Sequence, residues 1–171
     1  MSSTDALSIL TLLETAGIQV WLDGGWGIDA LLGEETRPHS DLDLVLPLTP
    51  AAQTKDLLKS RGFAVTEDHL PQGFAMEDQQ GRRVDFHTVY FNAEGAGIQE
   101  GRGGSFRYAP EGFKTVGYIS GHPVKCLSAQ VQADCHYGYE PDESDRRDME
   151  LLHERFGIKL LPPYAQESQQ Q

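Results

Sequence analysis

The segment DLDLVLP, residues 41–47, constrains the fold most, because its leucines occupy every second position. In a β-strand, residues two apart share one face of the sheet. The pattern predicts a strand whose leucine face packs into a core while Asp41 and Asp43 lie side by side on the other face. Pro47 ends the strand, since proline cannot donate to a sheet ladder. The chain must therefore build a sheet with one apolar face and a pair of carboxylates on the opposite face.

A second segment, RRVDFHTV, residues 82–89, repeats this arrangement in a long strand expected over 82–91. Its alternation places Asp85 and His87 on one face, opposite two apolar side chains. Next to the first pair of carboxylates, this strand would complete a cluster of three acids. Like charges so close together repel each other unless a cation lies between them, and a hard divalent ion with oxygen ligands suits the arrangement. Asp-x-Asp alone also occurs on ordinary solvent-facing strands, so the three acids matter only in combination.

Leucine spacing and glycine stops predict the remaining elements. Helices are expected from Ser3 or Thr4 to Gly17, from about 28 to Gly33, from Pro50 to Gly62, at 128–136 and at 143–156. Further strands are expected at 18–22, 63–66, 74–77 and 124–126, and residues 94–104, which contain five glycines, are expected to form a mobile loop. This order predicts the fold class α/β (α+β), with a mixed β-sheet flanked by helices.

The length of 171 residues fits one domain with a small appendage. We expect a core at 1–126, on which a short C-terminal helical segment at 127–160 packs. The remaining residues, 161–171, are expected to be a disordered polar tail, because its last residues, AQESQQQ, offer nothing to pack.

The chain has 14 Lys and Arg against 26 Asp and Glu, a formal charge of −12. This balance disfavours a nucleic-acid partner and favours a cationic small molecule. There is no long uncharged apolar run and no basic start, so we expect no membrane segment and a cytoplasmic location. Cys126 and Cys135 fit neither a zinc site nor a redox pair and are expected to be buried thiols.

Gly24 and Gly25 stand between an expected strand and an expected helix. The free N–H groups and the dipole at a helix N-terminus attract phosphate. The spacing differs from that of a Walker loop, which needs Gly, four residues and then Gly-Lys-Ser/Thr. A glycine turn combined with three acids is typical of metal-assisted phosphoryl transfer.

The stretches GGWGIDALLG, TRPHSDLDLVLP, RVDFHTV and GHPVKCLS resemble the nucleotidyltransferase superfamily of the DNA polymerase β type. More narrowly, they are similar to the aminoglycoside and lincosamide antibiotic nucleotidyltransferases. The resemblance covers about residues 20–130. It implies a nucleotidyltransferase fold with its catalytic core at 1–126. Trp26 stands where many superfamily members have serine, so a serine contact to phosphate is absent at that turn.

The resemblance also implies roles for individual residues. Gly24 and Gly25 would cradle the nucleoside triphosphate, Asp41 and Asp43 would bind magnesium, and Asp85 would be a third ligand or the general base. Near the Asp pair, Arg37 and His39 would contact the triphosphate or be ordinary solvated link residues. His87 would contact the substrate or be packed polar filler.

The implied reaction is transfer of a nucleoside monophosphate from an NTP to a hydroxyl of a small acceptor, with two Mg²⁺ ions and release of pyrophosphate. The acceptor would be an aminoglycoside, a lincosamide or a similar amino-sugar. Modification of a protein or an RNA end is one alternative, and an antitoxin-like binding module is another. A retired enzyme should lose its acids first, and all three are present. A homodimer is left open.

The C-terminal part is strongly acidic, with seven acids between residues 134 and 150 and only two arginines. Such a run is either a solvated face or a surface that attracts a cation. We expect Glu140, Asp142 and Glu143 to help bind a cationic acceptor.

Overall fold

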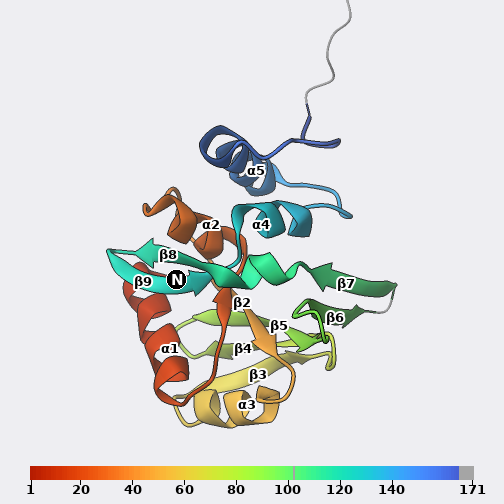
Figure 1. The fold of residues 1–171 in the computed structure, drawn as a ribbon. Coiled ribbons are helices and arrows are strands. Elements are labelled where there is room, and N and C mark those ends of the chain that lie inside the picture. The colour runs from red at the N-terminus through yellow and green to blue at the C-terminus, as the bar shows by residue number, and fades with distance from the viewer. Residues whose placement is uncertain (102, 166–171) are drawn as a thin grey trace, which may run out of the picture.

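The computed structural model describes residues 1–101 and 103–165, and a mixed β-sheet forms its centre (Figure 1). The strands are β1 (Trp21–Leu22), β2 (Asp41–Pro47), β3 (Phe63–Asp68), β4 (Gly73–Asp78), β5 (Arg83–Phe91), β6 (Gly97–Gly101), β7 (Gly104–Tyr108), β8 (Thr115–Ile119) and β9 (His122–Cys126). They pair in the order β3-β4-β5-β2-β1-β9-β8, and the β6–β7 hairpin extends from the end of β5. The predicted mixed sheet is confirmed.

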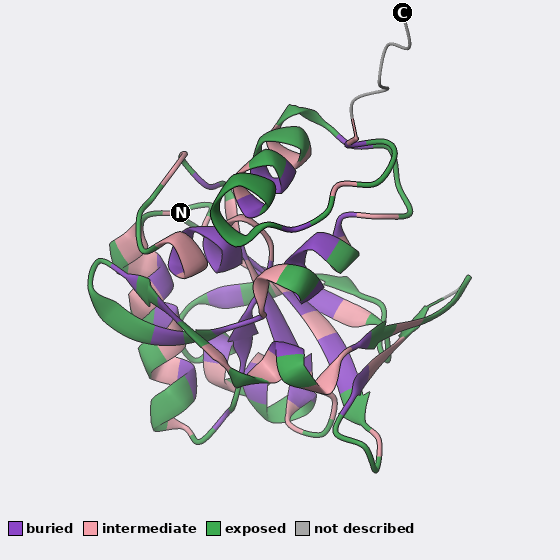
Figure 2. Ribbon diagram, turned by 45° about the horizontal axis from the view of Figure 1, so that its top comes forward, coloured by how far each residue is buried: buried purple, intermediate pink, exposed green. Residues whose placement is uncertain are grey.

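The two acid-bearing strands are neighbours. Strands β2 and β5 run parallel, and their register places Asp43 opposite Asp85. Figure 2 shows buried residues concentrated along the central strands. The alternating leucines of β2 lie on the buried side, and all three are fully buried: Leu42, Leu44 and Leu46.

Helices cover the sheet and add a second apolar layer (Figure 1). They are α1 (Ser3–Thr15), α2 (Gly24–Leu32), α3 (Ala51–Lys59), α4 (Ala129–Cys135) and α5 (Glu143–Phe156), with a short 3₁₀ helix, η1 (Pro110–Lys114). Helix α2 lies between two clusters: Trp26 and Ala30 join the main core with α1 and α3, while Ile28 packs with Met149 of α5. None of the helices in the described ranges is both long and apolar enough to cross a bilayer.

The helix starts differ slightly from the sequence expectation. Helix α1 is capped by Ser2, whose hydroxyl accepts from the Asp5 N–H while the Asp5 side chain accepts from the Ser2 N–H, so Ser2 replaces the expected Ser3 or Thr4. Helix α2 begins at Gly24, so the glycine turn forms its first residues rather than preceding it. Strand β1 is shorter than expected because residues 18–20 are outside the ladder.

The expectation of a loop at 94–104 is wrong for residues 97–101 and 104, which belong to the strands of the antiparallel β6–β7 hairpin. In this hairpin Ile98 pairs with Arg107. Residues 94–96 lie outside the strands. A Cβ on Gly97 would lie 2.7 Å from the Phe113 ring, so this glycine permits close packing rather than flexibility. Residue 102 lies outside the described residues.

The expectation of an unpacked tail is also wrong for its first part. Tyr164 is only 9 % exposed and packs with Ile28, Met149 and Leu152. Its hydroxyl donates to the backbone carbonyl of His136 at 2.7 Å. An aromatic ring with a polar tip can bury its body and still satisfy its hydroxyl. Residues 166–171 of the expected tail lie outside the described residues.

Helix α2 packs unusually close to strand β8, which gives a test of the fold. A Cβ on Gly117 would lie 2.4 Å from the backbone oxygen of Ala30, where only backbone could give way. We expect Gly117→Ala to lower the free energy of unfolding by about 1–3 kcal/mol, measured by urea denaturation. Gly103→Ala, with open space around it, is the control and should change it by less than about 0.5 kcal/mol. Equal effects in the two variants would contradict the close helix–strand contact.

Candidate active site

A cleft of about 730 Å³ opens where β2 and β5 meet the start of α2. The β6–β7 hairpin and helices α4 and α5 complete its walls. Seven of the residues predicted for the site line it: Gly24, Gly25, Arg37, Asp41, Asp43, His87 and Asp142. Asp142 is the N-cap residue of α5.

The three predicted acids lie on adjacent strands but do not converge on one point. Arg83 binds Asp85 through two hydrogen bonds, from Nε at 2.8 Å and from Nη2 at 2.7 Å. His87 Nε2 lies 3.5 Å from Asp43 Oδ1. In the part of the chain that the structure describes, no three acids, histidines or cysteines gather as a metal-binding group. In this structure Asp85 is paired with Arg83 and is not among the residues that line the cleft. Metal binding by all three acids together stays a prediction.

The charged groups in the cleft shift one another's pKa values. Burial raises the pKa of Asp41, and the neighbouring carboxylates Asp43 and Asp85 raise it further. Desolvation opposes the charged form of His87, but a hydrogen bond to Asp43 and the nearby acids outweigh it and raise the pKa of His87 to about 9. The surrounding carboxylates thus favour the protonated form of His87. The cleft floor favours positive charge.

The N-terminal turn of α2 lies directly against the acids. Asp23 caps the helix by accepting from the Gly24 N–H at 2.8 Å. Gly24 has a φ of +57°, which side chains rarely adopt, and a Cβ there would lie 2.6 Å from Asp43 Oδ2. The first N–H groups of a helix have no partner within the helix, so this turn can bind an anion beside the carboxylates.

The geometry of this turn predicts a large effect for a small substitution. The sequence resemblance implies a nucleoside triphosphate at this turn. We expect Gly24→Ala to weaken binding of that triphosphate by about tenfold or more, because the added methyl group meets Asp43 and the positive φ is strained. Isothermal titration calorimetry measures this affinity. Gly33→Ala, which shares a positive φ but has open space, is the control for backbone strain and should leave the affinity unchanged. A matching loss in both variants would argue against the close approach.

Arg37 reaches the cleft, whereas His39 does not line it. The His39 ring is buried, with Nε2 at 2.6 Å from Asp29 Oδ2 and its ring centroid 4.5 Å from that of Trp26. A direct contact between His39 and a phosphate therefore lacks support in this structure. The helix packing around it was not visible in the sequence.

The acidic residues in α5 and just before it divide between the cleft and the solvent. Asp142, Asp145 and Asp148 line the cleft, because residues three apart lie on neighbouring positions of one helix face. Glu140 and Glu143 are exposed and are not among the lining residues. Glu140 and Glu143 therefore do not line the cleft in this structure, and their role in binding a cationic acceptor stays a prediction. Asp145 and Asp148, which the sequence did not single out, line the cleft instead.

Sequence reasoning missed several cleft residues. Asp23 is 6 % exposed, and burial raises its pKa. Its position just before the glycine turn was a signal for it, since aspartate favours the N-cap. Gln99 comes from the segment that was expected to be a loop, and Tyr108 comes from the strand paired with it, β7. The Tyr108 hydroxyl donates to Gln99 Oε1 at 2.9 Å. Aromatic residues of the link after α4, Tyr137 and Tyr139, also line the cleft.

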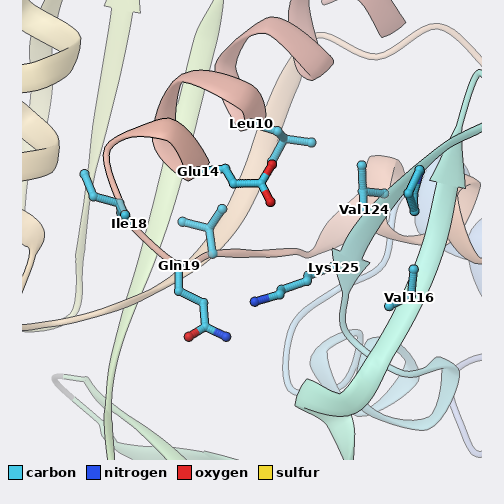
Figure 3. A pocket seen from close by; sticks show the side chains of 10 residues that line it. Leu10, Glu14, Ile18, Gln19, Val116, Val124 and Lys125 are labelled. Atoms are coloured by element: carbon cyan, nitrogen blue, oxygen red, sulfur yellow. The ribbon is translucent and has the colours of Figure 1, made fainter.

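A separate groove of about 470 Å³ lies between α1 and the β8–β9 hairpin. It shares no lining residue with the cleft. Figure 3 shows Glu14 and Lys125 beside it, among side chains that are mostly apolar. The groove contains neither the Asp41–Asp43 pair nor the Gly24–Gly25 turn, so the candidate active site is the cleft.

Comparison with known proteins assigns the chain to a family. The model of the family "Aminoglycoside-2''-adenylyltransferase" matches residues 5–152, which include every lining residue of the cleft. The chain belongs to this family. The resemblance found in the sequence and the prediction of a nucleotidyltransferase are thereby confirmed.

Two relatives resemble this chain over most of their own length. A 2''-aminoglycoside nucleotidyltransferase of Klebsiella pneumoniae is 34 % identical over 145 residues, 85 % of this chain and 77 % of the relative. A lincosamide resistance protein of Staphylococcus haemolyticus is 28 % identical over 145 residues, 84 % of this chain and 89 % of the relative.

Solved structures show the same fold. The lincosamide antibiotic adenylyltransferase LnuA with lincomycin bound superposes with a TM-score of 0.79 at 25 % identity, covering 89 % of this chain and 96 % of that one. ANT(2")-Ia in complex with adenylyl-2"-tobramycin gives a TM-score of 0.73 at 25 % identity, covering 91 % and 89 %. The predicted nucleotidyltransferase fold is confirmed.

Proposed function

We propose that this adenylyltransferase family member transfers the adenylyl group of ATP to a hydroxyl of an aminoglycoside or lincosamide antibiotic. The observation that carries the proposal is the juxtaposition of the α2 N-terminal turn with Asp41 and Asp43 in one cleft. The relatives support the adenylyl donor and the acceptor class. Two are named for lincosamides or aminoglycosides, and the two solved structures hold lincomycin and adenylyl-2"-tobramycin.

In the proposed reaction the acceptor oxygen forms a bond to the α-phosphorus of ATP. The bond from that phosphorus to the α–β bridging oxygen breaks, and pyrophosphate leaves. The hydroxyl proton passes to a carboxylate, for which Asp85 is the candidate, because β5 carries it beside Asp43. Arg83 holds the Asp85 carboxylate in one orientation.

The triphosphate binds at the start of α2. Gly24 and Gly25 leave room for phosphate oxygens close to the backbone, and the helix dipole favours their charge. Arg37 adds a guanidinium in the same wall of the cleft. His87 lines the same cleft from β5.

Asp41 and Asp43 fit a magnesium ion. Mg²⁺ is commonly held by one or two protein carboxylates together with substrate phosphates, so two neighbouring acids without a closed protein cage are suitable. Both are half-buried, and a divalent cation relieves the repulsion that raises the pKa of Asp41. Bound there, Mg²⁺ would neutralise phosphate charge and polarise the reacting oxygens. The two ions implied by the sequence resemblance remain part of this proposal.

The acceptor binds between the hairpin and the C-terminal helices. Four aromatic residues line that part of the cleft: Phe106, Tyr108, Tyr137 and Tyr139. Asp142 and Asp145 stand nearby on α5. Apolar ring faces combined with carboxylates suit an amino-sugar, whose ammonium groups gain from negative charge while its ring packs on aromatic surface.

Mass spectrometry of antibiotic panels tests the function. The chain is incubated with Mg²⁺, each NTP in turn, and single aminoglycosides or lincosamides. We expect ATP to add one adenylyl group to at least one antibiotic, with stoichiometric pyrophosphate. The Asp43→Asn variant is the matched negative control. Labelling of proteins or RNA ends with unchanged antibiotics would favour the alternative enzymes, and nucleotide binding without transfer would favour a binding module.

A further inference from the structure

Arg37 is held by an acid from the far end of the chain. Its Nη2 donates to Asp148 Oδ2 at 2.8 Å and its Nε donates to Asp148 Oδ1 at 3.3 Å. Two such bonds fix both the place and the plane of a guanidinium. The Asp148 side chain is only 4 % exposed, so solvent hardly competes for it. A residue 111 positions along the chain thus sets the orientation of Arg37.

A second acid supports Arg37 from the other side, through His39. Arg37 Nη1 lies 3.3 Å from His39 Nδ1, and this nitrogen must accept because a guanidinium only donates. The proton of the ring is then on Nε2, which donates to Asp29 Oδ2 at 2.6 Å. Thr36 donates its hydroxyl to the other Asp29 oxygen at 2.7 Å. The side chains Asp148, Arg37, His39 and Asp29 form one continuous chain, with a buried carboxylate at each end.

This chain of side chains lies against the first turn of α2. A Cβ on Gly25 would lie 2.6 Å from Arg37 Nη2 and 2.6 Å from His39 Nδ1. The missing side chain lets the guanidinium sit next to the helix N-terminus. Arg37 keeps about a quarter of its side chain exposed and lines the cleft, so it can still meet a ligand.

We propose that Asp148 is a positioning residue for the nucleotide: it holds the Arg37 guanidinium beside the α2 N-terminus, where Arg37 meets the triphosphate. This inference rests on the proposed function. It means that the nucleotide half of the site is incomplete without α5, although the phosphate-binding turn lies more than a hundred residues earlier in the chain. His39 acts in the same way, through Arg37 and not on the nucleotide.

The sign of the effect distinguishes this role from simple electrostatics. ATP is an anion, and an acid in the wall of its site repels it. If Asp148 were only a nearby charge, neutralising it would strengthen ATP binding. If Asp148 positions Arg37, neutralising it weakens ATP binding, because Asn presents an amide N–H₂ where the guanidinium needs an acceptor.

The test measures ATP affinity in Mg²⁺ by isothermal titration calorimetry, without an acceptor. We expect Asp148→Asn to raise the Kd for ATP by about 10- to 100-fold, the range for a charged hydrogen-bonded pair. Arg37→Lys, which keeps the charge but loses the fork, should raise it similarly. Glu150→Gln is the control, since it removes an exposed acid from the same helix, and should leave the Kd within about twofold.

A double-mutant cycle guards against a merely structural effect. Asp148→Asn combined with Arg37→Gln should bind ATP no more weakly than Arg37→Gln alone, because Asp148 acts only through Arg37. The affinity of the identified antibiotic should stay within about threefold of the wild type in Asp148→Asn. Additive losses in the double variant, or equal losses for ATP and antibiotic, would overturn the proposal. Melting temperatures identify a variant that fails to fold. If Asp148→Asn does not fold, the ATP Kd of Arg37→Lys tests the proposal: an unchanged Kd overturns it.

The two proposals fail in different ways. If the wild-type chain binds no ATP in Mg²⁺, the proposed function and the role of Asp148 both fall. If the wild type binds ATP and modifies an antibiotic while Asp148→Asn binds ATP as well or better, the function stands and the positioning role is wrong.

Discussion

Asp43→Asn should lower the rate of adenylyl transfer by at least about 10³-fold, because metal charge at the phosphates is worth several kcal/mol and each 1.4 kcal/mol is tenfold. Asn is isosteric with Asp but lacks the charge that a hard divalent cation needs. Asp43 also faces His87 and the Gly24 turn, so it connects three parts of the cleft. Steady-state turnover with ATP, Mg²⁺ and the identified antibiotic measures the effect.

The fold should survive this change. The Asp43 carboxylate raises the pKa of Asp41, so its removal relieves a repulsion while it also loses the contact with His87. We expect the melting temperature to move by a few degrees at most. Asp56→Asn, at a side chain that is 81 % exposed on α3, is the matched control and should retain full turnover. If Asp43→Asn turned over within tenfold of the wild type, the assignment of Asp43 to the catalytic site would be wrong.

Asp85→Asn should lower kcat by about 10²- to 10⁴-fold and leave ATP affinity nearly unchanged, as for loss of a positioned general base. The structure explains why the variant should affect kcat and not ATP affinity. Asp85 is the register partner of Asp43 on β5, whereas the proposed phosphate-binding turn lies directly against the Asp43 side chain. Parallel measurements of kcat and of the ATP Kd by calorimetry give the two readouts.

This variant also disturbs Arg83, which needs its own control. Arg83 donates to Glu67 at 2.9 Å as well as to Asp85. Glu67→Gln loosens Arg83 without changing Asp85, at a side chain that is half exposed. We expect this control to keep kcat within about threefold of the wild type. If Asp85→Asn raised the ATP Kd as strongly as it lowered kcat, Asp85 would be a nucleotide ligand and not the base.

The residues that could be predicted from the sequence are those whose role follows from local periodicity. The alternation in β2 predicted that its leucines would be buried and that Asp41 and Asp43 would share the other face, and the structure has both. The same rule predicted that Asp85 and His87 would share a face of β5. Both rest on a property of a single strand, so no knowledge of the rest of the chain was needed.

The hairpin at β6 and β7 could not be predicted in this way. Its glycines suggested flexibility, but the absence of a side chain at Gly97 makes room for the Phe113 ring. That ring comes from a segment sixteen residues later in the chain. A glycine that makes room for a distant neighbour has the same local sequence signal as one that loosens a loop.

The sequence by itself determined the local elements of the proposed site: a strand with two acids, a second strand with a third, and a glycine turn at the start of a helix. Only the tertiary structure decided which of the surrounding residues join that site. It buried His39 on Asp29, tied Arg37 to Asp148, and turned Asp145 rather than Glu143 toward the cleft. Periodicity determines which way a side chain points from its own element, but contacts between elements depend on how distant apolar faces pack, as α2 and α5 do around Ile28 and Met149.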